Sequence, residues 1–181
     1  MEARECIRNR RSVRKFDERE VPVELIREIV ADAAYAPSWK NTQPTRYIAV
    51  LDGSVREKIA SECVMDFAWN QKIIEGAPAL VVVTTVDKRS GYERDGSEST
   101  SKGSHWQSFD AGSAAEAFCL SAHAQGLGTV ILGVFDEEKV REALQIPEGE
   151  LVSALIPVGY PAEEPKAPKR KPVDELVRVI G

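Results

Sequence analysis

The run Ala79–Val86 constrains the fold more than any other part of the sequence, because every residue in it is apolar or β-branched. A strand with one solvent-facing side would alternate apolar and polar residues, so this run predicts a strand covered on both faces. Other strands are expected over 46–51, 129–134 and 151–158. The strand over 79–86 is therefore expected at the centre of a sheet.

Helical periodicity accounts for much of the remaining chain. The clearest helix opens with Pro22 in its first turn and keeps its apolar residues on one face to about Ala36, where Pro37 stops it. The alanine-rich helix over 106–125 has small residues on more than one side. That suits close helix packing in a dimer, although a buried core helix would have the same pattern. Shorter helices are predicted over 2–9, 54–64, 66–75 and 136–146, with a short closing segment over 173–180.

Residues 87–104 are rich in Ser, Gly, Lys, Glu and Asp and have no periodicity. They predict a long loop, and loops of this length are usually functional or mobile. The chain has 181 residues, of which 43% are hydrophobic and 29% charged. This composition is typical of one globular domain over 1–181, or of one protomer of a dimer.

The basic residues concentrate near the two ends of a chain whose net charge is −5. An acidic protein of this kind is not a general nucleic-acid binder, but its two ends could meet around one compact anion. Two solvated, charged end segments are the alternative, and charge alone favours it. Residues 1–15 hold six basic side chains and residues 166–171 hold four, namely Arg4, Arg8, Arg10, Arg11, Arg14, Lys15, Lys166, Lys169, Arg170 and Lys171.

Several classes of site and location are disfavoured. The three cysteines are far apart in the sequence and only two histidines are present, so neither a disulfide framework nor a metal site is expected. The apolar runs are too short to span a bilayer, and the first residues have no secretory signal pattern. A cytoplasmic protein without a membrane partner is the expectation.

Two kinds of catalytic motif are also absent from the sequence. No serine has the histidine and acid pattern of nucleophilic catalysis, and Gly126-Leu127-Gly128 lacks the third glycine of a dinucleotide fingerprint.

Two polar motifs could bind a phosphorylated heterocycle. In Arg10-Arg11-Ser12-Val13-Arg14, guanidinium groups offer bidentate recognition of phosphate, and alternate residues share a face if the stretch is extended. The segment Ala36–Pro44 places Ser, Asn and Gln between two prolines, where a stiff loop can present donors and acceptors to a flat ring. A basic turn and a plain connecting loop are the simpler interpretations. The tail motif Lys169-Arg170-Lys171-Pro172 could close over the same phosphate.

Together these motifs resemble the nitroreductase family. The resemblance rests on RRSVRKF at the N-terminus, APSWKNTQP before a strand, FDAGSAA and GLG around the long helix, PVGYP in the last strand and KRKP in the tail, in family order from about residue 6 to 177. It implies an α+β fold, with a mostly antiparallel central sheet flanked by helices. It also implies an intertwined homodimer in which the tail over 162–181 packs on the partner.

The resemblance further implies non-covalent FMN at the dimer interface. The first basic segment and the tail match phosphate-binding positions, whereas the segment between the prolines matches the stretch that reaches the partner's flavin. Asn70 matches an asparagine at the edge of the isoalloxazine ring, and 131–133 matches backbone near the reactive nitrogen. The implied cofactor-binding residues are Arg10, Arg11, Ser12, Arg14, Pro37, Ser38, Trp39, Asn41, Gln43, Asn70, Ile131, Leu132, Gly133, Lys169 and Arg170.

The implied activity is a ping-pong transfer of hydride from NADH or NADPH to a nitroaromatic, a quinone or another electron-poor acceptor. The flavin carries the chemistry, so no catalytic side chain is assigned, and Tyr92, His105 and Trp106 are candidates for substrate contact. The chain departs from the family pattern at Trp39, at Thr45 and in having no acidic residue over 131–133. The alternatives are a specialised relative such as a dehalogenase or dehydrogenase, and a flavin-binding protein with little turnover. A structural dimer without FMN is disfavoured, because clustered, unpaired buried arginines are costly.

Overall fold

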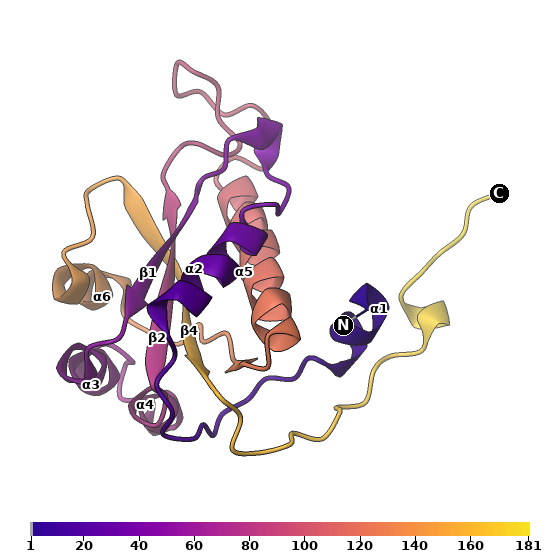
Figure 1. Ribbon diagram of the computed structural model, residues 1–181. Helices are drawn as coiled ribbons and strands as arrows, with labels where there is room; N and C mark the ends of the chain where they lie inside the picture. Colours follow the sequence, from indigo (N-terminus) through magenta and orange to yellow (C-terminus); the bar gives the residue numbers. More distant parts are fainter. Residues whose placement is uncertain (1) are drawn as a thin grey trace.

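The computed structural model describes residues 2–181 and has an antiparallel four-stranded sheet at its centre (Figure 1). The strands are β1 (Thr45–Val50), β2 (Ala79–Val86), β3 (Gly128–Thr129) and β4 (Glu150–Gly159), in the spatial order β1-β2-β4-β3. The predicted central strand is confirmed, because β2 pairs with β1 on one side and β4 on the other. The α+β class with a mostly antiparallel sheet is confirmed as well.

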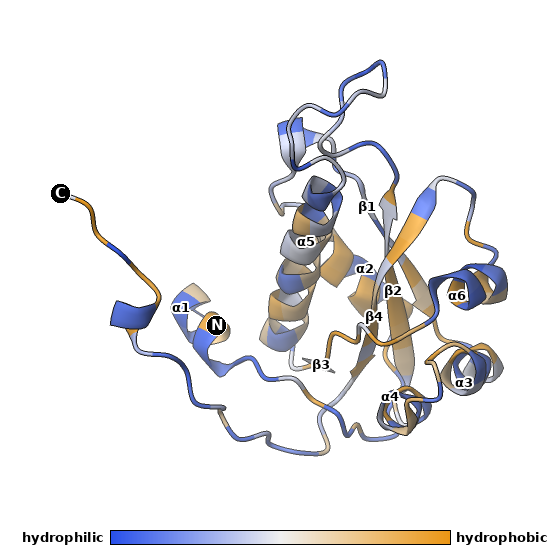
Figure 2. Cartoon of the chain, turned by 180° about the vertical axis from the view of Figure 1, so that it is seen from behind, coloured by the Kyte–Doolittle hydropathy of each residue, from blue (hydrophilic) through white to orange (hydrophobic). Residues whose placement is uncertain are grey.

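Helices cover both faces of the sheet, which explains why β2 is apolar along its length. Val81 and Val83 belong to the core beneath two helices, whereas Leu80 and Val82 point to the core beneath three others. Figure 2 shows hydrophobic colours along the central strands between these layers. The first layer consists of α2 (Val23–Ala33) and α5 (His105–Ala124), and the second of α3 (Gly53–Glu62), α4 (Ala68–Glu75) and α6 (Glu137–Leu144).

Local chemistry sets where several helices begin. Asp52 caps α3 by accepting hydrogen bonds from the backbone N–H groups of Ser54 and Val55, at 2.8 and 3.1 Å. Asp136 caps α6 as predicted, accepting from Lys139 N at 3.2 Å. Pro22 stands just before α2, which ends at Ala33 and is therefore shorter than the prediction. Each predicted helix is present, with boundaries that differ by up to three residues.

The predicted strand over 129–134 is wrong for most of its length, because β3 contains only Gly128 and Thr129. Leu132 still exchanges backbone hydrogen bonds with Leu155 of β4, at 2.8 and 3.1 Å. Two residues further along β4, the same side of the ladder is occupied by Pro157, which has no N–H to donate. The ladder is interrupted there, so residues 130–134 run beside β4 as an irregular edge segment.

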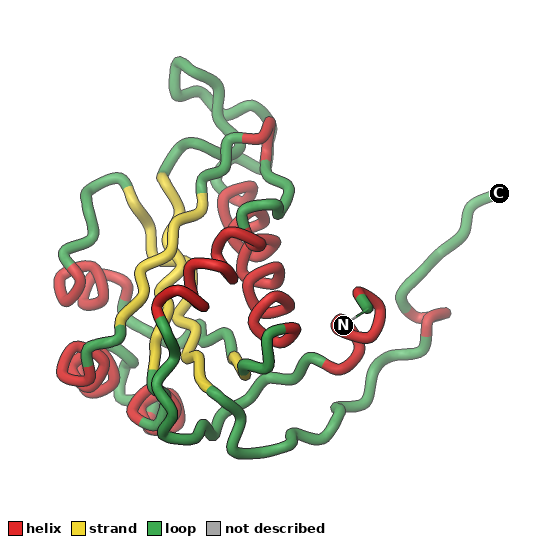
Figure 3. The backbone as a smooth tube through the Cα atoms, viewed as in Figure 1, coloured by secondary structure: helices red, strands yellow, loops and turns green. Residues whose placement is uncertain are grey.

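Both ends of the chain leave the sheet on the same side. The helix α1 (Ala3–Asn9) precedes an extended stretch, and the tail beyond β4 runs outward as a loop with one short turn, η2 (Val173–Glu175) (Figures 1 and 3). The predicted closing segment is reduced to that turn. None of the helices within residues 2–181 combines the length and apolar character that a bilayer crossing requires.

The half-buried phenol of Tyr47 makes stability depend on alkaline pH. Burial raises its pKa to about 12, above the value of about 10 expected in the unfolded chain. A pKa raised by folding gives stability that is fully present below pH about 10 and is lost as the pH rises towards 12. The phenol donates a hydrogen bond to the Ala114 carbonyl at 3.3 Å and its ring stacks on Phe118.

We therefore expect Tyr47→Phe to lose less stability than the wild type when the pH is raised from about 9 to about 11.5. Urea unfolding at the two pH values measures this difference. The Cys119 thiol, whose pKa burial raises to about 11, titrates in both proteins. Its negative charge adds to the rise in the Tyr47 pKa, so it enlarges the expected difference. Tyr35→Phe is the matched control, because Tyr35 is 90% exposed. An identical pH dependence in Tyr47→Phe and the wild type would contradict the assignment.

Candidate active site

The basic N-terminal motif is held against the edge of the sheet. Residues 10–16 are extended after α1, and Ser12 forms a parallel bridge to Thr129 while Val13 N donates to the Thr129 carbonyl at 2.9 Å. Gly128 permits this approach, since a Cβ atom there would lie 2.7 Å from the Cβ of Val13. The predicted extended row is thus present, and we call residues 10–14, Asn70 and 131–134 together the edge cluster.

The arginines of the edge cluster have different partners. Arg10 Nε lies 3.5 Å from a carboxylate oxygen of Glu116 on α5, although it makes no hydrogen bond. Arg11 Nη1 donates to the carbonyls of Arg8 and Arg10, at 2.7 and 2.8 Å. Arg14 Nη1 donates to the Ser12 carbonyl at 3.1 Å, and its guanidinium has no carboxylate partner within residues 2–181. Arg14 is exposed and therefore available to an anion.

Asn70 joins α4 to the irregular edge segment. It is only 4% exposed, and its Nδ2 atom donates to the Val134 carbonyl at 3.0 Å. Because Leu132 bonds to β4, the flanking N–H groups of Ile131 and Gly133 point away from the sheet, and neither makes a hydrogen bond within residues 2–181. Ile131 is 46% exposed and lines a cavity of about 410 Å³ between α5 and β4. The edge segment therefore presents free backbone donors beside this hollow.

The segment over 37–43, here called the proline loop, is built from unusual backbone geometry. Lys40, Asn41 and Gln43 have φ angles of 46°, 55° and 47°. Left-handed backbone costs roughly 1–2 kcal/mol for each residue other than glycine. Hydrogen bonds offset part of that cost, since Gln43 N donates to Ser38 Oγ at 3.0 Å and Trp39 N donates to Asp110 Oδ2 at 2.8 Å.

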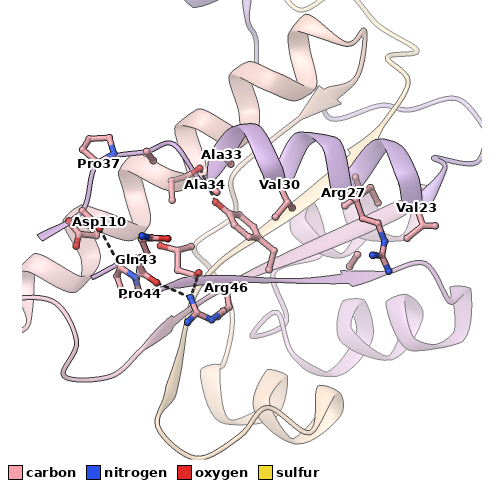
Figure 4. A pocket seen from close by; sticks show the side chains of 17 residues that line it. Val23, Arg27, Val30, Ala33, Ala34, Pro37, Gln43, Pro44, Arg46 and Asp110 are labelled. Atoms are coloured by element: carbon pink, nitrogen blue, oxygen red, sulfur yellow. Dashed lines mark hydrogen bonds between the residues drawn. The ribbon is translucent and has the colours of Figure 1, made fainter. Parts of the chain in front are cut away.

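The proline loop lines one end of a cavity of about 650 Å³ between α2 and β1. Figure 4 shows Pro37, Gln43 and Asp110 at that end and Arg27 at the other. Arg46 closes one side, because its Nη1 atom donates to the Gln43 carbonyl at 2.8 Å.

The structure places the predicted residues in separate groups. Arg10–Arg14, Asn70 and Ile131–Gly133 come together at one edge of the sheet, whereas the proline loop lies at the opposite end of the molecule (Figure 1). Lys169 and Arg170 are exposed in the tail, and no hydrogen bond or ion pair joins them to residues 10–14 within the described chain. Residues 2–181 contain no group of three potential metal ligands.

Sequence analysis missed the buried polar groups of α5. Gln107 accepts from Lys88 N, and Asp110 accepts from Trp39 N and from Ser90 Oγ. Both residues are buried. An acidic residue within the alanine-rich helix was the one available signal, and it pointed to no particular partner.

Comparisons with known proteins agree with this architecture. Residues 7–160 match the family model described as "Nitroreductase family". A protein of Methanothermobacter thermautotrophicus, with the provisional name NADH dehydrogenase/NAD(P)H nitroreductase, is 33% identical over 91% of this chain and 80% of its own. An iodotyrosine deiodinase of Haliscomenobacter hydrossis is 29% identical over 95% of this chain and 85% of its own.

A solved structure extends the agreement to three dimensions. The NADPH:FMN oxidoreductase of Vibrio harveyi, complexed with NAD⁺, superposes with a TM-score of 0.81 at 26% identity, covering 97% of this chain and 75% of that one. The extended basic motif, the edge segment beside the last core strand and the antiparallel sheet all lie within the matched residues 7–160. This chain belongs to the nitroreductase family.

Proposed function

We propose that the protein is an FMN-dependent oxidoreductase that passes hydride from NADH or NADPH to an electron-poor acceptor, such as a nitroaromatic or a quinone. The observation that carries this proposal is the edge cluster, in which one sheet edge presents a guanidinium without a carboxylate partner and free backbone donors. A cytoplasmic location and a ping-pong order of reaction belong to the same proposal.

The residues of the edge cluster fit FMN. A phosphate needs charged donors, and Arg14 offers a guanidinium without a carboxylate partner. Ser12, two residues earlier, offers a hydroxyl. A flavin edge needs paired donors and acceptors, and Asn70 with the N–H groups of Ile131 and Gly133 supplies them. When bound, FMN would accept and return the hydride. Lys169 and Arg170 would add charge at the phosphate end.

The chain's own residues would bind FMN, orient its ring and polarise it. Arg10, Arg11 and Arg14 would fix the phosphate, while Ser12 holds their strand in register with β3. The N–H donors of Ile131 and Gly133 would favour added negative charge on the ring, because preorganised dipoles stabilise charge that develops next to them. No side chain in the edge cluster needs to act as an acid or a base.

A homodimer completes this proposal. The proline loop is far from the edge cluster of its own chain, so Pro37, Ser38, Trp39, Asn41 and Gln43 would meet a flavin only in a partner. The tail supports association, because it leaves the body of the chain with five large apolar side chains exposed. These are Val173, Leu176, Val177, Val179 and Ile180, with exposed fractions from 54% to 85%.

Steady-state kinetics test the reaction order. We expect double-reciprocal plots against NADH or NADPH, at several fixed concentrations of a quinone, to give parallel lines. The reason is that the oxidised donor would leave before the quinone binds. Anaerobic mixing of the FMN-loaded protein with each donor then identifies the preferred one. Intersecting lines, or no oxidation of either donor, would contradict the proposed function.

The similarity to a deiodinase supports a second candidate, reductive dehalogenation of an iodinated phenol. Release of iodide from 3-iodotyrosine by the dithionite-reduced protein distinguishes it. Release faster than nitroaromatic reduction would favour the second candidate over the first.

A further inference from the structure

One buried carboxylate ties the proline loop and the loop over 87–104 to the long helix. Asp110 is only 3% exposed, and its Oδ2 atom accepts from Trp39 N at 2.8 Å and from the hydroxyl of Ser90. A buried carboxylate is costly unless donors of this kind surround it. Asp110 therefore joins three segments that are distant in the sequence.

The proline loop needs such an anchor more than an ordinary turn does. Its left-handed residues Lys40, Asn41 and Gln43 are unfavourable without support from outside the loop. The other tie from the loop to residues 87–104 is the ion pair of Lys40 with Glu93 at 2.7 Å, which is exposed. Exposed ion pairs contribute little. The bond to Asp110 is thus the one polar contact of Trp39 to a buried group outside the loop, within the described chain.

Two indole rings report on this restraint. Trp39 packs against Trp106, with ring centroids 4.8 Å apart and planes tilted by 47°. Trp106 lies on the same helix one turn before Asp110, so the hydrogen bond from Trp39 N holds the backbone of Trp39 next to the helical turn that carries Trp106.

We propose that Asp110 is a positioning residue that sets Trp39, and through it the flanking Ser38 and Asn41, for contact with the flavin of the partner. This inference rests on the proposed function for its effect on FMN. Ser90 donates a second hydrogen bond to the same oxygen atom, and this bond holds the start of the loop over 87–104. In this proposal Asp110 acts through Trp39 and Ser90 rather than by direct contact with FMN.

The first test uses the protein without FMN. Coupled tryptophans give an exciton couplet in far-ultraviolet circular dichroism, and its loss in Trp39→Phe and in Trp106→Phe defines the signal. We expect Asp110→Leu to lose the couplet, Asp110→Asn to keep part of it and Ser90→Ala to keep it fully. Asp95→Asn, at the exposed tip of the same loop, is the matched control, and thermal unfolding shows that each variant is folded.

The second test measures the dissociation constant of FMN by quenching of its fluorescence. Loss of a hydrogen bond to a charged group predicts that Asp110→Leu raises the constant about tenfold, with a smaller rise for Asp110→Asn. Ser90→Ala should stay within about twofold, because the bond from Trp39 N remains.

A folded Asp110→Leu with the wild-type couplet and the wild-type dissociation constant would overturn the inference. If that variant does not fold, Asp110→Asn is the deciding variant. Changes in its couplet and its FMN dissociation constant no larger than those of Ser90→Ala would overturn the inference. A wild-type protein that binds no FMN would remove the proposed function, whereas the couplet would still decide whether Asp110 positions Trp39.

Discussion

Replacing Arg14 with methionine should weaken FMN binding about 10- to 100-fold, because a hydrogen bond to a charged group contributes roughly 1.5–3 kcal/mol. Methionine keeps much of the side-chain length and removes the charge. Arg14 is exposed and its guanidinium has no carboxylate partner within residues 2–181. Its backbone N–H donates to Glu163 Oε1 at 2.8 Å, and this bond does not depend on the side chain. The substitution should therefore leave the free energy of unfolding of the apoprotein nearly unchanged. This variant should therefore lose FMN affinity without losing stability.

Titration of FMN by fluorescence quenching measures the effect, and the difference between variant and wild type should shrink as salt is added, since salt screens exposed charges. Arg4→Met is the matched control, because Arg4 is a basic residue of the same N-terminal region outside the edge cluster. Equal affinities for the wild type and Arg14→Met would remove the phosphate role from this arginine.

Deleting residues 166–181 should convert the proposed dimer into a monomer that does not retain FMN. The tail exposes five large apolar side chains, and each would contribute up to roughly 1.5–3 kcal/mol if buried against a partner. Even half of this total corresponds to a dissociation constant raised by about 500-fold or more. The deletion also removes Lys169 and Arg170.

Analytical ultracentrifugation across a concentration series checks this expectation. The sheet should stay folded in the truncated chain, because the contacts of the tail with the body end near its start, where Ala162 N donates to the Lys15 carbonyl at 2.9 Å. Leu176→Asp combined with Ile180→Asp is the finer variant, with Glu175→Gln as its control. A truncated protein that stays dimeric would show that association does not depend on the tail.

Much of the fold follows from short-range pattern. The apolar run over 79–86 predicted a strand covered on both faces, and its alternate residues enter two separate cores. The helices followed from periodicity and from caps such as Asp136. Information of this kind is local, so a single sequence suffices for it.

The sequence-based predictions fail where a residue distant in the sequence determines the local structure. Nothing within 129–134 indicates that the strand stops, because the interruption comes from Pro157 in the neighbouring strand β4. Gly128 has its reason in the approach of Val13, more than 100 positions earlier in the chain. Such pairings depend on tertiary register, which periodicity does not encode.

The candidate site divides in the same way. The extended row of Arg10, Ser12 and Arg14 could be predicted from spacing, and Asn70 from family resemblance. Asp110 could not be assigned, because its partners Trp39 and Ser90 belong to two other segments of the chain. The assembly of the edge cluster with the proline loop requires a second chain, and it stays a prediction.

The visible absorbance spectrum tests the central claim most directly. Purified protein would be mixed with excess FMN, separated from free FMN by gel filtration, and treated anaerobically with NADH and then NADPH. We predict a retained flavin spectrum that bleaches with at least one donor and returns when a quinone is added. A folded dimer that retains no flavin would contradict the account, and a bound flavin that neither donor bleaches would contradict the reductase activity.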